Sequence, residues 1–301
     1  MNDPLVSVTV ITYNSAATVI ETLDSIKYQT YRNLELIVSD DGSTDNTVDI
    51  CRHWLAVNES RFVRVVFLEV PNNTGVAANL NRAEDACQGQ WVKGISGDDL
   101  LCPDAIDQYM GYVDSHPDAS FMFAHVKAFG VDEQRCRMYD ESVFDYDFLK
   151  QPSKEQIRRL EIENNYIPAA SFFYKLSSYR NLGIRNDERI PLLEDHPKWI
   201  NMLKKGARFD LIEDVTVEYR LTEGSLSTSS IRSAKFIQSV ALFYILYQFK
   251  PQYKSTKSFY QIHKLIAAHH LTDNNIFWNS LWRIYTMRRR VLGKPAPVFF
   301  Y

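Results

Sequence analysis

Two adjacent carboxylates, Asp98 and Asp99, follow an apolar run that begins at Trp91. The β-branched residues of that run favour a buried strand, and Pro103 suits the first turn of a following helix. Two neighbouring carboxylates repel each other, and a hard cation such as Mg²⁺ or Mn²⁺ held between them and a phosphate relieves the repulsion. The same residues also suit a solvated Asp-Asp turn, so this pair alone leaves both interpretations open.

A second acid pair, Glu194 and Asp195, precedes a predicted helix over Trp199–Lys205, which ends at Gly206. A carboxylate close to a substrate hydroxyl can take its proton as a general base. Acids are also common in the first turn of a helix, where they complement the helix dipole. Position alone therefore allows a catalytic and a structural role for this pair.

Strands alternate with helices in the first half of the chain. Apolar runs predict strands at Val6–Ile11, Leu34–Val38 and Val63–Val70, ahead of the strand that ends at Asp98. Strand and helix in alternation predict a parallel sheet with right-handed crossovers. Beyond that strand, the pattern predicts a helix over Pro103–Ser115, a strand over Ala119–Phe129, an irregular stretch over 131–165 with a helix near Lys154–Glu163, and a strand over Tyr166–Tyr174.

Polar clusters follow three of the predicted strands. They are Thr12-Tyr13-Asn14, Asp40-Asp41 and Asp98-Asp99. The carboxyl ends of parallel strands meet at one edge of a sheet, and open α/β sheets bind their ligands there. This convergence favours one functional site over three unrelated solvated turns.

The composition sets limits on the class of protein. Of 301 residues, 45% are hydrophobic and 24% charged, as in soluble globular proteins. The net charge of −3 gives no reason to expect nucleic acid as a partner. Four cysteines without a C-x-x-C pair predict neither a zinc site nor a disulfide framework. Without a signal-peptide pattern or an apolar run approaching the ~20 residues of a membrane span, we expect the cytoplasm.

In their order and spacing, the motifs resemble those of the inverting glycosyltransferases of family 2, in the version found in bacterial enzymes that build surface polysaccharides such as O-antigen or capsule. The resemblance covers about residues 5–225 and is carried by Val8–Asn14, Asp40–Asp45, Asn73–Gly75, Asn81, Gly89, Gly97–Asp99, Glu194-Asp195 and Tyr219-Arg220. It implies an α/β GT-A fold, a Rossmann-like and mostly parallel sheet flanked by helices. The implied catalytic domain spans 1–230, with a nucleotide-sugar half of about 1–130 and an acceptor half of about 131–230. A helical C-terminal region would follow over 231–301.

The resemblance also implies roles for individual residues. Asp195, next to Glu194, would be the catalytic base, and Asp98 and Asp99 would bind Mn²⁺ or Mg²⁺. The implied donor-binding residues are Thr12, Tyr13, Asn14, Asp40, Asp41, Asn81 and Asp98, with UDP as the commonest nucleotide. Two positions depart from the family pattern: Ser96 replaces the first acid of the Asp-x-Asp motif, and Leu80 replaces an arginine.

The implied reaction moves a sugar, with inversion, to a hydroxyl of a saccharide acceptor, which is lipid-linked in similar enzymes. A predicted helix over Asn275–Leu292 combines aromatic residues with Arg288–Arg290, which suits a peripheral contact with the inner face of the cell membrane or, equally, packing on the catalytic domain. Oligomerisation is left open.

Two other functions are alternatives to a glycosyltransferase. A nucleotidyltransferase that makes sugar nucleotides would need a glycine-rich, basic loop after the first strand, and Thr12–Ser15 contains neither glycine nor lysine. The other alternative is a non-catalytic GT-A scaffold that binds a partner.

Overall fold

The computed structural model describes residues 3–162, 165–190 and 192–222, with isolated positions at 239, 242, 243, 246 and 247. Contacts between Cα atoms divide the chain into two compact units, Met1–Ser239 and Val240–Tyr301. The first unit carries all the predicted site residues and is the subject below. The predicted boundary near residue 230 stays a prediction, and the predicted membrane helix over Asn275–Leu292 lies outside the described residues.

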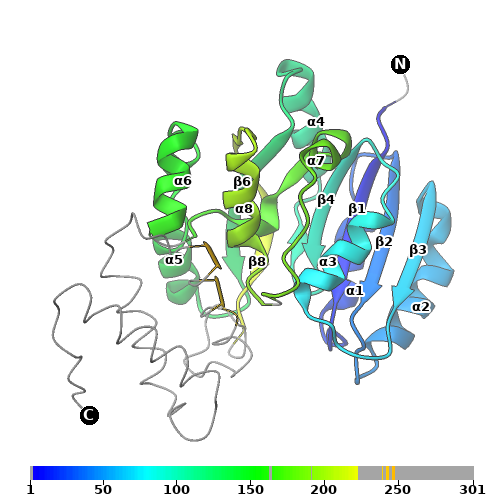
Figure 1. The fold of residues 1–301 in the computed structure, drawn as a ribbon. Helices are drawn as coiled ribbons and strands as arrows, with labels where there is room; N and C mark the ends of the chain where they lie inside the picture. Colours follow the sequence, from blue (N-terminus) through cyan, green and yellow to red (C-terminus); the bar gives the residue numbers. More distant parts are fainter. Residues whose placement is uncertain are drawn as a thin grey trace, which may run out of the picture. The chain divides into compact units, whose positions relative to one another are not determined.

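A mixed sheet organises the first unit (Figure 1). In the described part it has eight strands in the order β3-β2-β1-β4-β7-β6-β8-β5. Their bounds are β1 Val6–Thr12, β2 Leu34–Asp40, β3 Arg64–Glu69, β4 Trp91–Ser96, β5 Leu100–Leu101, β6 Phe121–Phe129, β7 Phe173–Lys175 and β8 Asp210–Arg220. The strands β1 to β4 are parallel to one another, as the alternating sequence pattern predicts.

Helices pack on both faces of this sheet. Val6, Val8 and Val10 alternate with the small polar residues of β1, and they join a buried core with side chains of α1, α2 and α4. On the other face, α3 contacts β1 and β2. The helices are α1 Val19–Lys27, α2 Thr47–Asn58, α3 Val76–Asp85, α4 Ala105–Ser115, α5 Glu133–Ser142, α6 Ser153–Ile162, α7 Leu176–Leu182 and α8 Asp195–Lys204.

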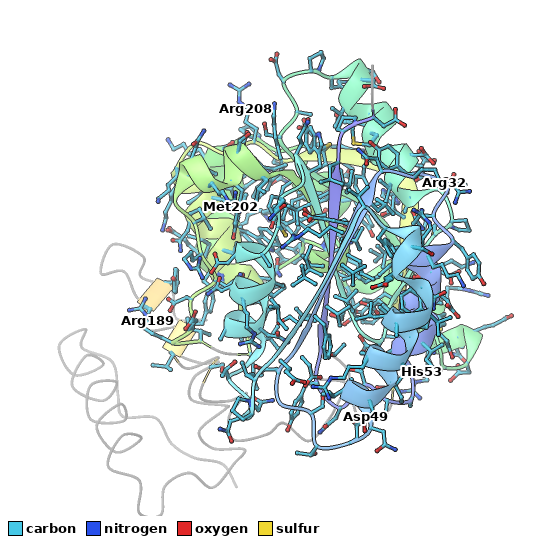
Figure 2. The ribbon with its side chains drawn as sticks, turned by 90° about the vertical axis from the view of Figure 1, so that its right-hand side faces the viewer. Arg32, Asp49, His53, Arg189, Met202 and Arg208 are labelled. Atoms are coloured by element: carbon cyan, nitrogen blue, oxygen red, sulfur yellow. The ribbon has the colours of Figure 1, made fainter. Side chains whose placement is uncertain are left out.

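The strand directions define one functional edge. Because β7 is antiparallel to both β4 and β6, the strand β6 runs parallel to β4, and β8 pairs parallel with β6. The helix α8 leads into β8, which begins at the amino edge of the sheet. The last turn of α8 therefore lies toward the amino edge and its first turn toward the carboxyl edge. Figure 2 agrees: Asp49 after β2 and Arg189 ahead of α8 lie toward one end of the molecule, and Arg32 and Arg208, ahead of β2 and β8, toward the other.

The second half of the chain departs from the sequence prediction in several places. Most of Tyr166–Tyr174, predicted as a strand, is a loop with a 3₁₀ turn at Ala169–Ser171, and only its end belongs to β7. Pro168 lacks an N–H and so suits a turn better than a ladder. The helix α5 lies in the stretch predicted to be irregular, and β5, α7 and β8 were not predicted.

A helix was predicted over Trp199–Lys205, and its predicted start was wrong, because α8 begins at Asp195. Pro197 falls in the first turn, where a helix needs no N–H donor, so it does not interrupt the helix. As a consequence, the second acid pair belongs to the start of α8 instead of to a loop ahead of it.

Candidate active site

The ends of β1 and β2 are joined through their side chains. Thr12 and Asp40 are register partners, and Thr12 Oγ1 donates to Asp40 Oδ2 at 2.8 Å. Ser43 donates to the same carboxylate from its backbone N (2.8 Å) and its Oγ (2.6 Å). Asp40 is therefore a buried acceptor fixed by three donors, as a rigid wall of a binding site requires.

Asp41, also buried, fixes the loop that follows β3. Its carboxylate accepts from Gly75 N (2.7 Å), from Thr74 N (3.0 Å) and from the Thr74 hydroxyl. Arg82 on α3 adds an ion pair at 3.0 Å. Gly42 lets the loop after β3 come close to the end of β2. It has a φ of 75°, and a Cβ there would lie 2.7 Å from the Asn72 backbone.

Asn14 shapes the turn after β1 with a φ of 52°, a left-handed conformation that asparagine tolerates better than most residues. Its Oδ1 accepts from Thr44 N at 2.8 Å, and its backbone N donates to Ser43 Oγ at 2.8 Å. The neighbouring Tyr13 ring is 46% exposed. An exposed ring at this edge offers a flat surface against which a planar group can stack.

The pair Asp98 and Asp99 follows β4 and meets the end of β8. The Asp99 side chain is buried, and its Oδ1 accepts from the backbone N of Arg220 at 2.9 Å. The Arg220 guanidinium donates through Nε to the Asp98 carbonyl (2.6 Å) and pairs through Nη2 with Glu21 (2.5 Å). Residues from opposite ends of the unit thus assemble one site.

Both carboxyls of this pair resist ionisation. Burial, with the neighbouring Asp98 charge adding to it, raises the pKa of Asp99 to about 8. Burial also raises the pKa of Asp98, although Arg220 opposes this. Two desolvated carboxyls that repel each other fit a divalent cation, which would relieve both costs. The described residues contain no group of three His, Cys, Asp or Glu able to hold a metal, so the other ligands would be substrate oxygens or water.

The Asn81 side chain contacts a different part of the chain from the residues at these strand ends. Its side chain is buried on α3, where Oδ1 accepts from Asn186 N at 2.9 Å and Nδ2 donates to Glu188 Oε1 at 2.8 Å. It therefore fastens α3 to the segment that leads to α8. Its contact with a nucleotide stays a prediction, as do those of the other predicted donor-binding residues.

The pair Glu194 and Asp195 lies at the start of α8. Asp195 Oδ1 accepts from the backbone N of His196 (2.7 Å), and Oδ2 accepts from Nδ2 of Asn165 (2.5 Å). Burial, with the Asp195 charge adding to it, raises the pKa of Glu194 to about 7, and burial raises the pKa of Asp195 as well. The nearby Lys198 ammonium opposes both shifts. A carboxyl that titrates near neutral pH can exchange a proton with substrate.

His196 is a core residue. It is buried, its Nε2 lies 2.8 Å from the Leu160 carbonyl oxygen, and burial lowers its pKa to about 4. The imidazole is therefore neutral at physiological pH and helps to seat α8 on α6.

Sequence reasoning missed several residues that build the site. Arg82 holds Asp41 and also donates to Asn79 Oδ1 at 2.9 Å; the three-residue spacing of Asn79 and Arg82 was an available signal. Lys93 is fully buried in β4, donates to the Ala170 carbonyl at 2.6 Å, and burial lowers its pKa to about 7. A lysine within an apolar strand pattern was a second available signal. Asn165 had none, since only the fold brings it to Asp195.

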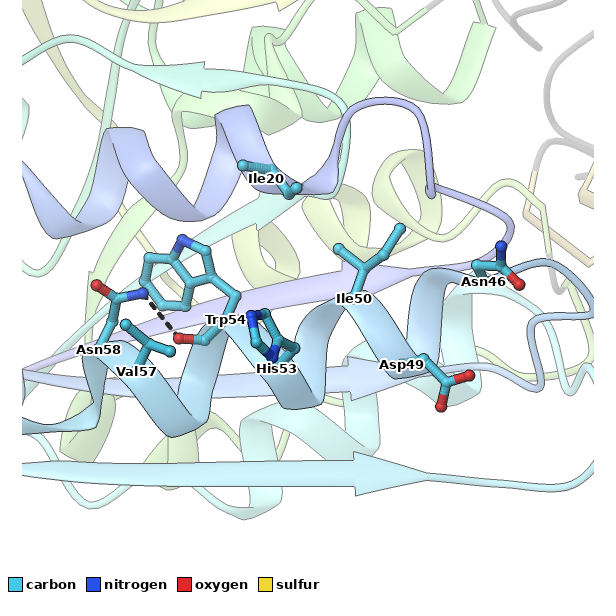
Figure 3. Close-up of a pocket in the computed structure, with 8 residues that line it drawn as sticks. All are labelled: Ile20, Asn46, Asp49, Ile50, His53, Trp54, Val57 and Asn58. Carbon is cyan, nitrogen blue, oxygen red and sulfur yellow. Dashed lines mark hydrogen bonds between the residues drawn. The ribbon is translucent and has the colours of Figure 1, made fainter.

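A cavity of about 600 Å³ lies elsewhere, on the outer side of α1 and α2 (Figure 3). Its lining residues are Ile20, Asn46, Asp49, Ile50, His53, Trp54, Val57 and Asn58. None of the predicted site residues lines it. The chemistry at the carboxyl edge, and not this cavity, marks the candidate active site.

No helix in the described part of the chain combines the length and the apolar character needed to cross a bilayer.

Comparison with known proteins identifies the family of this chain. The model of the family described as "Glycosyl transferase family 2" matches residues 7–183. TuaG of Bacillus subtilis, named a putative teichuronic acid biosynthesis glycosyltransferase, is 27% identical over 77% of this chain and 85% of its own length. WfaP of Escherichia coli, named a UDP-Glc:alpha-D-GlcNAc-diphosphoundecaprenol beta-1,3-glucosyltransferase, is 23% identical over 79% of this chain and 87% of its own.

A solved structure with the same fold is S. aureus TarS 1–349 in complex with UDP-GlcNAc. Its TM-score is 0.60 at 18% identity, with coverage of 89% of this chain and 74% of that one. Against the longer TarS crystal structure, the chain covers 44% of the TarS polypeptide. The match confirms the predicted GT-A architecture, with its mostly parallel sheet flanked by helices.

Proposed function

Since the chain belongs to glycosyl transferase family 2, we propose that it moves a sugar, with inversion, from a nucleotide-diphosphate donor to a hydroxyl of a saccharide acceptor. One observation carries the proposal: an acid pair after β4 and a second at the start of α8 both lie toward the carboxyl edge of one sheet. The transfer needs one group at the leaving diphosphate and another at the incoming hydroxyl.

The donor binds at the ends of β1 and β2. Thr12 and Asp40 form a rigid polar wall for the ribose and base, and the exposed Tyr13 ring stacks on the base. Asn14, Asp41 and Asn81 hold the surrounding loops in place. UDP is the proposed nucleotide, because the name of WfaP specifies UDP-Glc and the TarS structure contains UDP-GlcNAc.

Asp98 and Asp99 would hold Mn²⁺ or Mg²⁺ between themselves and the diphosphate. The ion, when bound, neutralises the negative charge that grows on the leaving diphosphate. Arg220 keeps the pair in position through its backbone N–H to Asp99 and its guanidinium contact with the Asp98 carbonyl. Ser96 stands where the family motif has its first acid, so the site depends on these two carboxylates.

Asp195 takes the proton from the acceptor hydroxyl. A hydroxyl is a weak nucleophile until a base removes its proton, and burial raises the pKa of Asp195, which makes its carboxylate a stronger proton acceptor. Attack from the face opposite the diphosphate inverts the anomeric centre. Glu194 is the neighbouring acid, and burial together with the Asp195 charge raises its pKa to about 7.

The acceptor is proposed to be a lipid-linked saccharide of a surface polysaccharide such as O-antigen or capsule. The names of WfaP, which includes a diphosphoundecaprenol-linked sugar, and of TuaG support this assignment. The reaction would then take place at the inner face of the cell membrane, and the basic segment Arg288–Arg290 would contribute a peripheral contact.

A panel of nucleotide sugars tests the proposal. A ligand that binds only the folded state raises the Tm, so UDP-glucose and UDP-GlcNAc, with GDP-mannose as comparison, are screened with MnCl₂ and with EDTA. We expect a manganese-dependent shift with a UDP-sugar and UDP release when an acceptor is added. Pyrophosphate formation from UTP and a sugar phosphate would instead identify a nucleotidyltransferase, and binding without turnover across a broad acceptor panel a scaffold.

A further inference from the structure

The acid pair on α8 has unequal surroundings. Both oxygens of Asp195 receive a donor from another residue, Oδ1 from His196 N at 2.7 Å and Oδ2 from Asn165 Nδ2 at 2.5 Å. In the part of the chain that the structure describes, no other residue donates a hydrogen bond to the Glu194 carboxyl. Donors that point at a carboxylate stabilise its charged form, so the two acids are not equivalent.

The orientation of the Asn165 amide is set by the backbone. Asn165 Oδ1 accepts from Ile167 N at 3.1 Å, so the oxygen side of the amide is already committed. The NH₂ side must therefore face Asp195, which means that Asn165 acts as a donor and cannot accept a hydrogen bond from a protonated Asp195 without breaking this contact. The geometry favours an ionised partner.

The charged and titratable groups around the pair do not reproduce this asymmetry. In the described part, they are Lys198, His196 and Lys204 on α8, Glu84 on α3, and Glu161 on α6, which forms an ion pair with Lys204. Lys198 acts on both acids and lies 3.8 Å from Glu84, and His196 is neutral because burial lowers its pKa. The donors are the features that separate Asp195 from Glu194.

We infer that Asn165 is a positioning residue that keeps the negative charge of the acid pair on Asp195 and leaves the shared proton on Glu194. A general base must be ionised before it can accept a proton, so this arrangement selects which carboxylate serves the acceptor hydroxyl. The inference rests on the proposed role of Asp195 as the base, but the charge order of the pair can be measured without turnover.

The first measurement is a ¹³C NMR titration of the aspartate and glutamate carboxyl carbons in the full-length protein, without donor or metal. Asp195→Asn and Glu194→Gln assign the two resonances. We expect Asp195 to titrate below Glu194, and Asn165→Leu to raise the midpoint of Asp195 by about one pH unit through loss of a donor. Asn181→Leu, the same substitution at an exposed position on α7, serves as the control and leaves both midpoints unchanged. A midpoint of Asp195 above that of Glu194 in the wild type, or one that Asn165→Leu does not move, overturns the inference.

Asn165→Asp, nearly identical in shape, covers the case in which the leucine variant fails to fold. It replaces the donor by a third acid, so the midpoint of Asp195 should rise further than in Asn165→Leu; an unchanged midpoint again overturns the inference.

The second measurement is the pH dependence of UDP release from UDP-glucose or UDP-GlcNAc. In Asn165→Leu, the acidic limb of kcat moves to higher pH by about the same amount while KM for the donor stays within about twofold, as expected when only the base changes. If no nucleotide sugar is turned over, the proposed function fails, whereas the NMR titration still decides the charge order.

Discussion

The two acid pairs use the same kind of residue in different surroundings. Asp98 and Asp99 follow a central strand, where Arg220 supplies a backbone donor, and burial with mutual repulsion raises the pKa of Asp99. Glu194 and Asp195 open a helix, burial raises the pKa of both acids as well, and a side-chain amide contacts Asp195 from another segment. The first arrangement suits a bound cation and the second a movable proton. The partners around a carboxylate, more than the carboxylate itself, determine its task.

The largest expected effect tests the proposed metal site at Asp98 and Asp99. Asp99→Asn removes one of the two proposed metal ligands, so it should abolish the manganese-dependent Tm shift with a UDP-sugar and lower turnover by about 10³-fold, on the scale of several kcal/mol that a metal contributes. Asp98→Asn should act in the same direction. Asp104→Asn, an exposed acid just beyond the site, is the matched control. Undiminished manganese-dependent binding in both site variants would refute the metal assignment.

The next effect tests the proposed general base, Asp195. Asp195→Asn should keep donor binding and lose turnover by about 10²-fold or more, the scale of general base catalysis. Glu194→Gln should cost much less, because it keeps a hydrogen-bonding side chain and does not remove the proposed base. Steady-state rates with thermal shifts as a binding control measure both. If Glu194→Gln stops turnover while Asp195→Asn does not, the roles of the two acids are reversed.

A smaller effect concerns the link between β4 and β8. Arg220→Lys keeps the backbone N–H to Asp99 but loses the guanidinium fork that joins the Asp98 carbonyl to Glu21. Because lysine cannot reproduce that fork, we expect kcat/KM to fall by about tenfold, equivalent to roughly 1.4 kcal/mol. Arg185→Lys, at an exposed ion pair with Asp85, is the control and should leave kcat/KM unchanged. A normal rate in Arg220→Lys would show that the backbone contact suffices.

The smallest effect is on stability in the absence of metal. The pKa of Asp99 is raised from 3.8 to about 8 in the folded protein, so this group favours folding below pH 4 and loses that contribution as the pH rises to 8. The Tm of the metal-free wild type should therefore fall with pH over this window more steeply than that of Asp99→Asn, by roughly ten degrees across the whole window. Differential scanning calorimetry with and without MnCl₂ measures it. Equal slopes in the two proteins would mean that Asp99 ionises freely.

The sequence alone determined the first half of the sheet and the location of the acids. Apolar runs at β1 to β4 predict strands because a buried parallel strand must be apolar on both faces, and the polar residues at their ends follow from the direction of the chain. Local signals of this kind are complete within about ten residues. The same signals placed Asp98 and Asp195 in motifs that resemble a known family, and the model of that family matches residues 7–183.

Only the tertiary structure decided how the second half closes the site. β8 pairs with β6 and β5, far away in the chain, so no local pattern sets its bounds or brings Arg220 to Asp99. Likewise, Asn165 reaches Asp195 across 30 residues of sequence. Side-chain periodicity reports which residues are buried, but it carries no information on which distant partner a polar group meets. That partner sets the charge of each acid, and so its chemistry.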